Sequence, residues 1–108
     1  MIVPKKFKIF GNTINVVFEE DEFKNTNSIG LANFRQQKIT LHPPATGDHP
    51  ITDSMVCTTY LHECVHMIFD ALGYFDARDD ENLVELVAQL LYQILTTGEG
   101  VLHEHTDS

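Results

Sequence analysis

The chain has 108 residues and a mass of 12.3 kDa, a size that predicts one domain. Its residues are 43% hydrophobic and 21% charged, which is enough for one core and excludes a disordered chain. The formal net charge is −9, and ten of the 16 acidic residues lie in residues 55–108 beside one basic residue, Arg78. Such a surface repels nucleic acid and anionic membranes, so we expect neither as a partner.

The N-terminus and the cysteines both indicate the cytoplasm. Three lysines interrupt the apolar residues of MIVPKKFKIF, and no apolar run approaches the ~18 residues of a membrane span. If Cys57 and Cys64 share one helix, their spacing places them roughly 10 Å apart along its axis. A disulfide needs Cα atoms about 4.4–6.8 Å apart, so we expect free thiols in a reducing compartment.

The first 42 residues carry strand patterns separated by turn residues. Gly11 and Asn12 form one expected turn, and a polar loop follows over residues 20–27. This turn and residues 35–37 predict two hairpins, one between the first two expected strands and one between the last two, so we expect a small antiparallel sheet of three to four strands. The expected strands are Lys5–Phe10, Thr13–Glu19, Ile29–Phe34 and Lys38–His42.

The next predicted element is a long, apolar helix. Thr52 or Asp53 can cap its N-terminus, and Gly73 is typical of the residue that ends a helix at about Leu72. Apolar residues cover most of its circumference, so we expect this helix in the middle of the domain.

A second helix is expected from Asp79 or Asp80 to just before Gly98, because acidic residues stabilise a helix N-terminus. The connection between the two helices is short, which predicts antiparallel neighbours. Strands followed by helices indicate the α+β class, with a single domain over residues 1–98 and a polar, flexible tail over 99–108.

The first predicted helix contains an H-E-x-x-H motif at residues 62–66. His62 and His66 are one turn apart, so they project from one face and can bind one metal ion. Glu63 lies about 100° around the helix from His62, where it can act as a general base without displacing a ligand. Burying these polar groups in an apolar helix is costly unless they are paired or liganded, which favours a metal site over a chance pattern.

A zinc site of this type needs a third protein ligand. Glu81 and Glu85 are the best placed, because they lie one turn apart on the face of the second helix that is opposite its polar residues. Two carboxylates facing a core need a cation or a histidine nearby, and the small Ala88 on the same face allows the helices to approach closely. The full set of candidates is Glu81, Glu85, His42, His49, His103 and His105.

An H-E-x-x-H motif followed by an acidic helix resembles the gluzincin metallopeptidases, and residues 80–85, DENLVE, are similar to the N-E-x-x-x-D segment of that family. The resemblance implies that Glu81 is the third zinc ligand and that Glu85 is a carboxylate supporting His62. It also implies that Asp70 braces His66 or the helix. At this size the chain looks closest to minimal gluzincins and ImmA/IrrE-type domains, including phage and prophage members, which have a small antiparallel sheet packed on two zinc-bearing helices.

We therefore expect a zinc metalloendopeptidase that binds one Zn²⁺ through His62, His66 and Glu81 and hydrolyses a protein or peptide with Glu63 as the general base. The alternative is a zinc-stabilised binding module with little or no activity, whose acidic half docks a basic protein. A third interpretation has no metal, and the histidines and carboxylates then satisfy one another.

Two further expectations concern the substrate. Tyr60 and Tyr92 are candidates for contacts with the oxyanion or the substrate. The strand Lys38–His42 is the expected sheet edge beside the cleft, where an extended substrate can pair by strand addition. The sequence leaves the substrate's identity and the oligomeric state open.

Overall fold

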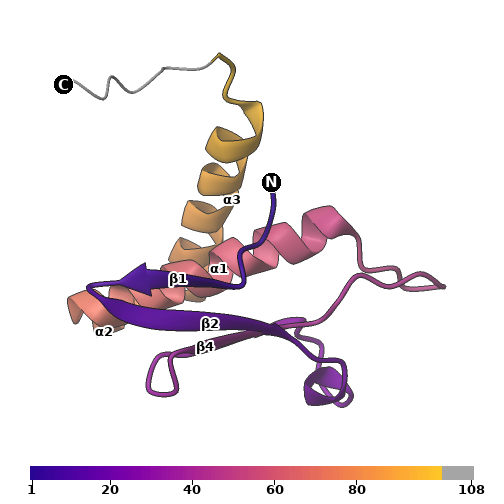
Figure 1. Cartoon of the computed structure of the whole chain (residues 1–108), viewed down its shortest axis with the longest axis horizontal. Coiled ribbons are helices and arrows are strands. Elements are labelled where there is room, and N and C mark those ends of the chain that lie inside the picture. Colours follow the sequence, from indigo (N-terminus) through magenta and orange to yellow (C-terminus); the bar gives the residue numbers. More distant parts are fainter. Residues whose placement is uncertain (101–108) are drawn as a thin grey trace.

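A computed structural model describes residues 1–100 and has a sheet packed against a long helix (Figure 1). This architecture confirms the predicted α+β class. The strands are β1 (Lys6–Ile9), β2 (Asn12–Phe18), β3 (Gly30–Asn33) and β4 (Lys38–Leu41). The helices are the 3-10 helix η1 (Asp21–Phe23), α1 (Asp53–Leu72), the short α2 (Phe75–Arg78) and α3 (Glu81–Thr97).

The four strands form a mixed sheet in the order β1-β2-β4-β3. The two predicted hairpins are present, since β1 pairs antiparallel with β2 and β3 pairs antiparallel with β4. However, β2 and β4 are parallel, with Val16 opposite Ile39, so the prediction of a wholly antiparallel sheet was wrong. The long segment that contains η1 carries the chain to the far edge, and β4 then returns beside β2 in the same direction.

This strand order also corrects the predicted sheet edge. β4 lies between β2 and β3, and its residues Ile39, Thr40 and Leu41 are all buried. Strands with neighbours on both sides and cover on their faces tend to have continuous buried runs, which explains this pattern. The strand predicted at the edge is therefore internal, and the two edge strands are β1 and β3.

Helix α1 has the predicted ends. The Thr52 side chain accepts a hydrogen bond from the Met55 N–H at 3.1 Å, and Gly73 ends the helix in the left-handed conformation with φ 76°. The largest fully buried side chains of the domain come from α1, α3 and the sheet, and they are Ile14, Ile39, Leu41, Val65, Met67 and Val84. One contiguous core thus lies between α1 and the sheet and continues to α3.

Helix α3 does not run beside α1 as an antiparallel partner. Figure 1 shows α3 crossing α1 and rising away from the sheet, so the two helices are neighbours, as predicted, but they are not antiparallel. The connection contains α2, which redirects the chain before Asp80 caps α3 by accepting a hydrogen bond from the Leu83 N–H at 3.1 Å. Val84 and Ala88 are the fully buried residues of α3, and the packing of this helix against the domain continues through the half-buried Leu91 and Tyr92.

Three other expectations can be compared with the structure. No helix within residues 1–100 combines the length and apolar character needed to cross a membrane. Cys57 and Cys64 are buried free thiols, as predicted. The predicted flexible tail, with His103 and His105, falls from residue 101 onward outside the described residues.

Candidate metal centre

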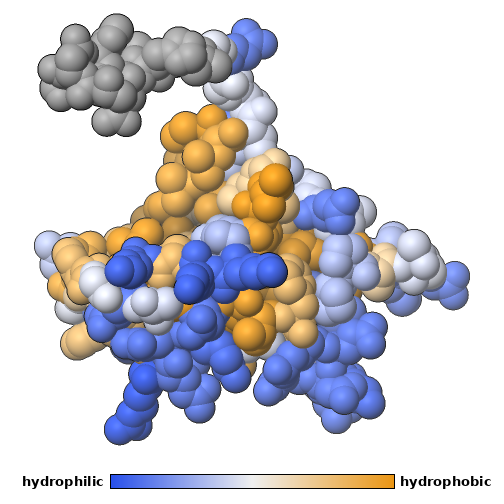
Figure 2. Space-filling view, in the orientation of Figure 1, coloured by the Kyte–Doolittle hydropathy of each residue, from blue (hydrophilic) through white to orange (hydrophobic). Residues whose placement is uncertain are grey.

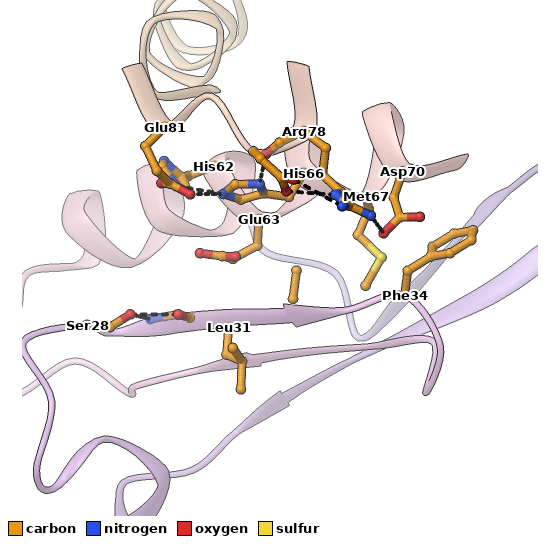
Figure 3. Close-up of a pocket in the computed structure, with 13 residues that line it drawn as sticks. Ser28, Leu31, Phe34, His62, Glu63, His66, Met67, Asp70, Arg78 and Glu81 are labelled. Carbon is orange, nitrogen blue, oxygen red and sulfur yellow. Dashed lines mark hydrogen bonds and ion pairs between the residues drawn. The ribbon is translucent and has the colours of Figure 1, made fainter. Parts of the chain in front are cut away.

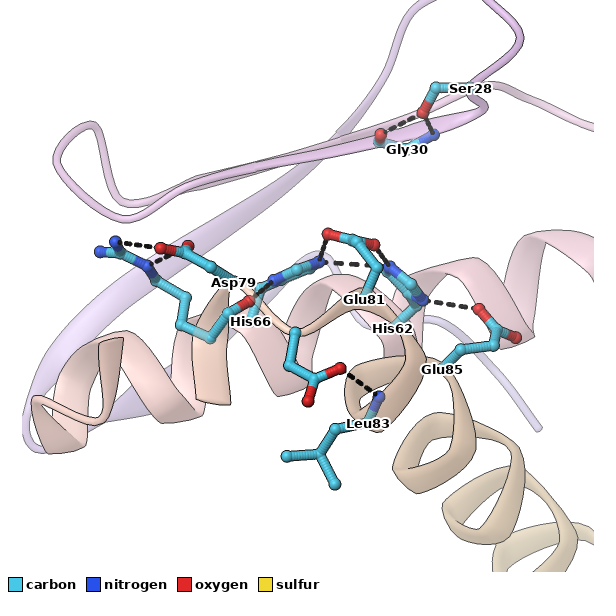
Figure 4. A network of polar contacts seen from close by, with 10 residues as sticks. Ser28, Gly30, His62, His66, Asp79, Glu81, Leu83 and Glu85 are labelled. Carbon is cyan, nitrogen blue, oxygen red and sulfur yellow. Dashed lines mark hydrogen bonds and ion pairs between the residues drawn. The ribbon is translucent and has the colours of Figure 1, made fainter. Parts of the chain in front are cut away.

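The side chains of His62, His66 and Glu81 converge at the junction of α1 and α3 (Figure 4). The two Nε2 atoms are 3.2 Å apart, and the Glu81 carboxylate oxygens lie 3.2 Å from His62 Nε2 and 3.0 Å from His66 Nε2. Tetrahedral zinc with bonds of about 2.0–2.1 Å places neighbouring ligand atoms about 3.3 Å apart. The spacing of these three donors therefore fits one zinc ion.

The outer nitrogen of each imidazole has its own hydrogen-bond acceptor. His62 Nδ1 donates to Glu85 Oε2 at 2.7 Å, and His66 Nδ1 donates to the backbone carbonyl of Arg78 at 2.7 Å (Figure 4). Because Nδ1 donates in both rings, an unprotonated Nε2 directs its lone pair toward the Glu81 carboxylate, and a protonated Nε2 donates to it. When both Nε2 atoms are unprotonated, they and the Glu81 carboxylate are three acceptors that face one another, and such a group needs a shared proton or a cation between its members.

Local sequence explains how these groups meet. His62 and His66 are one turn apart on the face of α1 that contacts α3. The cap at Asp80 makes Glu81 the first residue of α3, and Glu85 follows one turn later. The Glu81 side chain is 69% exposed, so the donor cluster is open to solvent on one side. A ligand set with one open side leaves room for water or a substrate group.

Glu63 lies on the neighbouring face of α1 and points toward β3 (Figure 3). The residue is 8% exposed, and desolvation raises its pKa above the ordinary carboxyl value. Two influences act the other way and lower this pKa: positive charge on His62 and His66, and a hydrogen bond from the Ala32 backbone. The effect of burial is the largest, so the pKa of Glu63 is raised overall. A carboxylate with a raised pKa is better matched to accepting and returning a proton near neutral pH.

Gly30 in β3 makes the close approach of the sheet to Glu63 possible. A Cβ atom at this position would overlap Thr59 Cγ2 and would lie 3.1 Å from Glu63 Oε2. The φ angle of Gly30 is not positive, so space and not backbone conformation requires glycine here. This role was not predicted from the sequence, although a glycine inside a strand pattern is a known indication of close approach.

A cavity of about 440 Å³ lies between β3 and α1 and contains His62, Glu63, His66 and Glu81 in its wall (Figure 3). Phe34 and Met67 make one end of it apolar. A second cavity of about 170 Å³ shares His62 and Glu63 and extends toward residues of polar character, Thr58, Thr59 and Glu85. Glu63 therefore lines both cavities, and both cavities lie beside β3.

The free edge of β3 borders both cavities. The Ile29 carbonyl accepts from the His42 N–H, so the alternate residues Gly30 and Ala32 direct their backbone groups away from β4. Ser28 occupies part of this edge, since its Oγ donates to the Gly30 carbonyl at 2.7 Å and accepts from the Gly30 N–H at 3.3 Å. No sequence pattern indicated this role for Ser28.

Asp70 does not contact His66 directly. Its carboxylate lies 3.4 Å from the Arg78 guanidinium, which also pairs with Asp79 at 2.8 Å and lies over the Phe75 ring. The hydrogen bonds from Arg78 lower the pKa of Asp79. These contacts fix the end of α2 that supplies the carbonyl acceptor for His66, so Asp70 supports that histidine through Arg78, whose role was not predicted from the sequence.

The structure does not bring Tyr60 or Tyr92 into the cavity. Tyr60 is buried against the edge of the Phe7 ring, and burial raises the pKa of its hydroxyl well above the ordinary value. The Tyr92 hydroxyl lies 2.9 Å from Ser54 Oγ, where it joins α3 to the start of α1. The candidate ligands His42 and His49 also lie outside the donor cluster.

No family model, curated protein or solved structure matches this chain. The resemblance to gluzincins thus rests on the motif and on the arrangement of the side chains described above.

Proposed function

We propose that this chain is a zinc-dependent metallopeptidase of the gluzincin type. The observation that carries the proposal is the convergence of His62 Nε2, His66 Nε2 and the Glu81 carboxylate at spacings of 3.0–3.2 Å. Glu85 orients His62, and the Arg78 carbonyl orients His66. A His₂Glu donor set with one open side is the ligand chemistry of catalytic zinc.

A bound Zn²⁺ would polarise the substrate carbonyl and lower the pKa of a water molecule toward ~7. Glu63 accepts the proton of the attacking water at its carboxylate and passes it to the departing amine nitrogen. Its burial favours this cycle, because desolvation raises the pKa of the carboxyl and Gly30 holds the strand close beside it. The protein thus contributes the donor set, the proton carrier and a fixed distance between them.

The substrate we propose is an extended segment of a protein or peptide that lies along β3. The outward-facing backbone groups of this edge border the cavities on both sides of Glu63, so residues before and after the scissile bond would each have a site. Phe34 and Met67 favour an apolar side chain at one end. Ser28 must rotate away for pairing at Gly30. The buried free thiols and the acidic surface support a cytoplasmic location without a nucleic-acid or membrane partner.

The test combines metal analysis with one isosteric substitution. We expect one zinc per chain in both the wild type and Glu63→Gln, and cleavage of a peptide library by the wild type alone. Glu19→Gln, which changes an exposed glutamate, serves as the matched control and should cleave like the wild type. A metal-replete preparation that holds no zinc, or equal cleavage by Glu63→Gln, would refute the proposal.

A second candidate function is a zinc-stabilised binding module without peptidase activity. It is favoured by the limited burial of α3, because a metal bridge from Glu81 to α1 would hold a helix whose fully buried side chains are only Val84 and Ala88. Here a chelator lowers the melting temperature strongly, and the peptide library stays intact with zinc bound. Cleavage that Glu63→Gln abolishes excludes this function.

A further inference from the structure

The outer face of α3 carries a stripe of exposed aliphatic side chains. Leu83, Leu86, Leu90 and Ile94 recur every three or four residues and are between 37% and 66% exposed. Figure 2 shows this helix as an apolar ridge that rises from a mostly hydrophilic body. The stripe lies on a different face from Val84 and Ala88, so contact with α1 does not cover it.

The C-terminal turns of α3 also extend beyond the domain. Leu95 lies on the same helix face as the fully buried Val84 and Ala88, yet it is 57% exposed. Every residue from Gln93 to Thr97 is exposed. A 17-residue helix is about 25 Å long, so roughly its last third presents apolar groups on more than one side.

Charge on α3 is confined to its beginning. Glu81 and Glu85 are the charged residues of this helix, and residues 86–98 include none. In a chain of net charge −9, two copies can approach along this segment without bringing like charges together. A charged partner would find no oppositely charged group on this segment, whereas the same apolar stripe of a second copy is complementary to the first.

The exposed area suits a contact between helices. The four stripe residues together expose on the order of 400 Å², within the range of the largest apolar patch on a monomer. A standard interface buries about 800 Å² per partner, so these four side chains supply about half of one. Spacings of three and four residues are those of knobs-into-holes packing between helices.

We propose that α3 pairs antiparallel with α3 of a second copy of this chain through Leu83, Leu86, Leu90 and Ile94. The antiparallel arrangement places the two acidic bodies at opposite ends of the helix pair, which minimises their repulsion. Glu81 and Glu85 lie on a different face of α3, so the donor cluster of each copy stays open. The pairing does not depend on zinc or on peptidase activity.

Light scattering coupled to size exclusion at about 100 μM chain tests the pairing, because this concentration populates any dimer with a Kd of about 10 μM or tighter. We expect the wild type at twice the monomer mass of 12.3 kDa. Leu90→Gln and Ile94→Glu should each elute at 12.3 kDa with unchanged circular dichroism, because both side chains are exposed in the single copy. Thr96→Glu adds a charge on another face and should remain a dimer.

Two results would overturn the proposal. A wild type that is monomeric at this concentration means that α3 does not pair with α3 of a second copy. Binding of a different protein to the stripe would then be a separate interaction and would not rescue the proposal. A dimer that survives in both Leu90→Gln and Ile94→Glu means that the copies associate through another surface. Leu90→Gln keeps a good helix former of similar length, so its outcome does not depend on a folding defect.

Discussion

Substitution of Gly30 by alanine is the most direct test of how the sheet positions Glu63. The added methyl group would overlap Thr59 Cγ2 and crowd the Glu63 carboxylate, so β3 or the Glu63 side chain must move. Overpacking of this kind typically costs about 1–3 kcal/mol, and the lower entropy of the unfolded alanine chain offsets about 0.4–1 kcal/mol. We expect a net loss of about 1–2 kcal/mol in the free energy of unfolding.

The loss should be visible in both stability and activity. For a domain of this size, about 1–2 kcal/mol corresponds to a fall in melting temperature of about 5–15 °C. If the proposed function is correct, displacement of Glu63 by a few tenths of an ångström to 1 Å should lower kcat by up to about 100-fold. Zinc content should not change, because Gly30 contacts none of the three donor atoms.

A double-mutant cycle isolates the cause. Thr59→Ser removes only the Cγ2 methyl that the new side chain at position 30 would overlap, so the pair Gly30→Ala with Thr59→Ser should recover about 1 kcal/mol relative to additive losses. Chemical denaturation of the four proteins measures this coupling. A Gly30→Ala protein as stable as the wild type, or a cycle without coupling, would show that the close approach is not what requires glycine.

Three further predictions concern the site. Burial raises the pKa of Glu63 in the folded state, so the stability that this group contributes without zinc is complete below the ordinary carboxyl pKa and is lost as pH rises through the folded pKa. We therefore expect the free energy of unfolding of the chelated wild type to fall relative to that of Glu63→Gln as pH rises from about 4.5. Chemical denaturation of both proteins at several pH values measures this difference. Glu85→Gln should weaken zinc affinity by about 10–100-fold in a competition titration, because His62 loses its charged acceptor, and an unchanged affinity would contradict the role of Glu85. Ser28→Ala should lower KM for an extended peptide, since it frees the backbone groups of Gly30, and a raised KM would indicate that Ser28 binds substrate instead.

Local sequence was sufficient to predict the elements that depend on nearby residues. The caps at Thr52 and Gly73 set the ends of α1, and the four-residue spacing of His62 and His66 placed both rings on one helix face. The hairpins followed from short turns, because contacts between neighbouring residues decide them. The choice of Glu81 came from the resemblance of residues 80–85 to a family segment, and the structure brings this residue to both histidines.

Long-range packing decided the rest of the arrangement. The sequence by itself determined the two hairpins and the histidine pair, because those depend on hydrogen bonds and dihedral angles within a few residues. Only the tertiary structure made β2 and β4 parallel, put β3 at the edge and turned α3 across α1, because these arrangements join segments far apart in the chain and are selected by the burial of shared apolar surface. The same packing brought the Arg78 carbonyl to His66 and left Gly30 no room for a side chain.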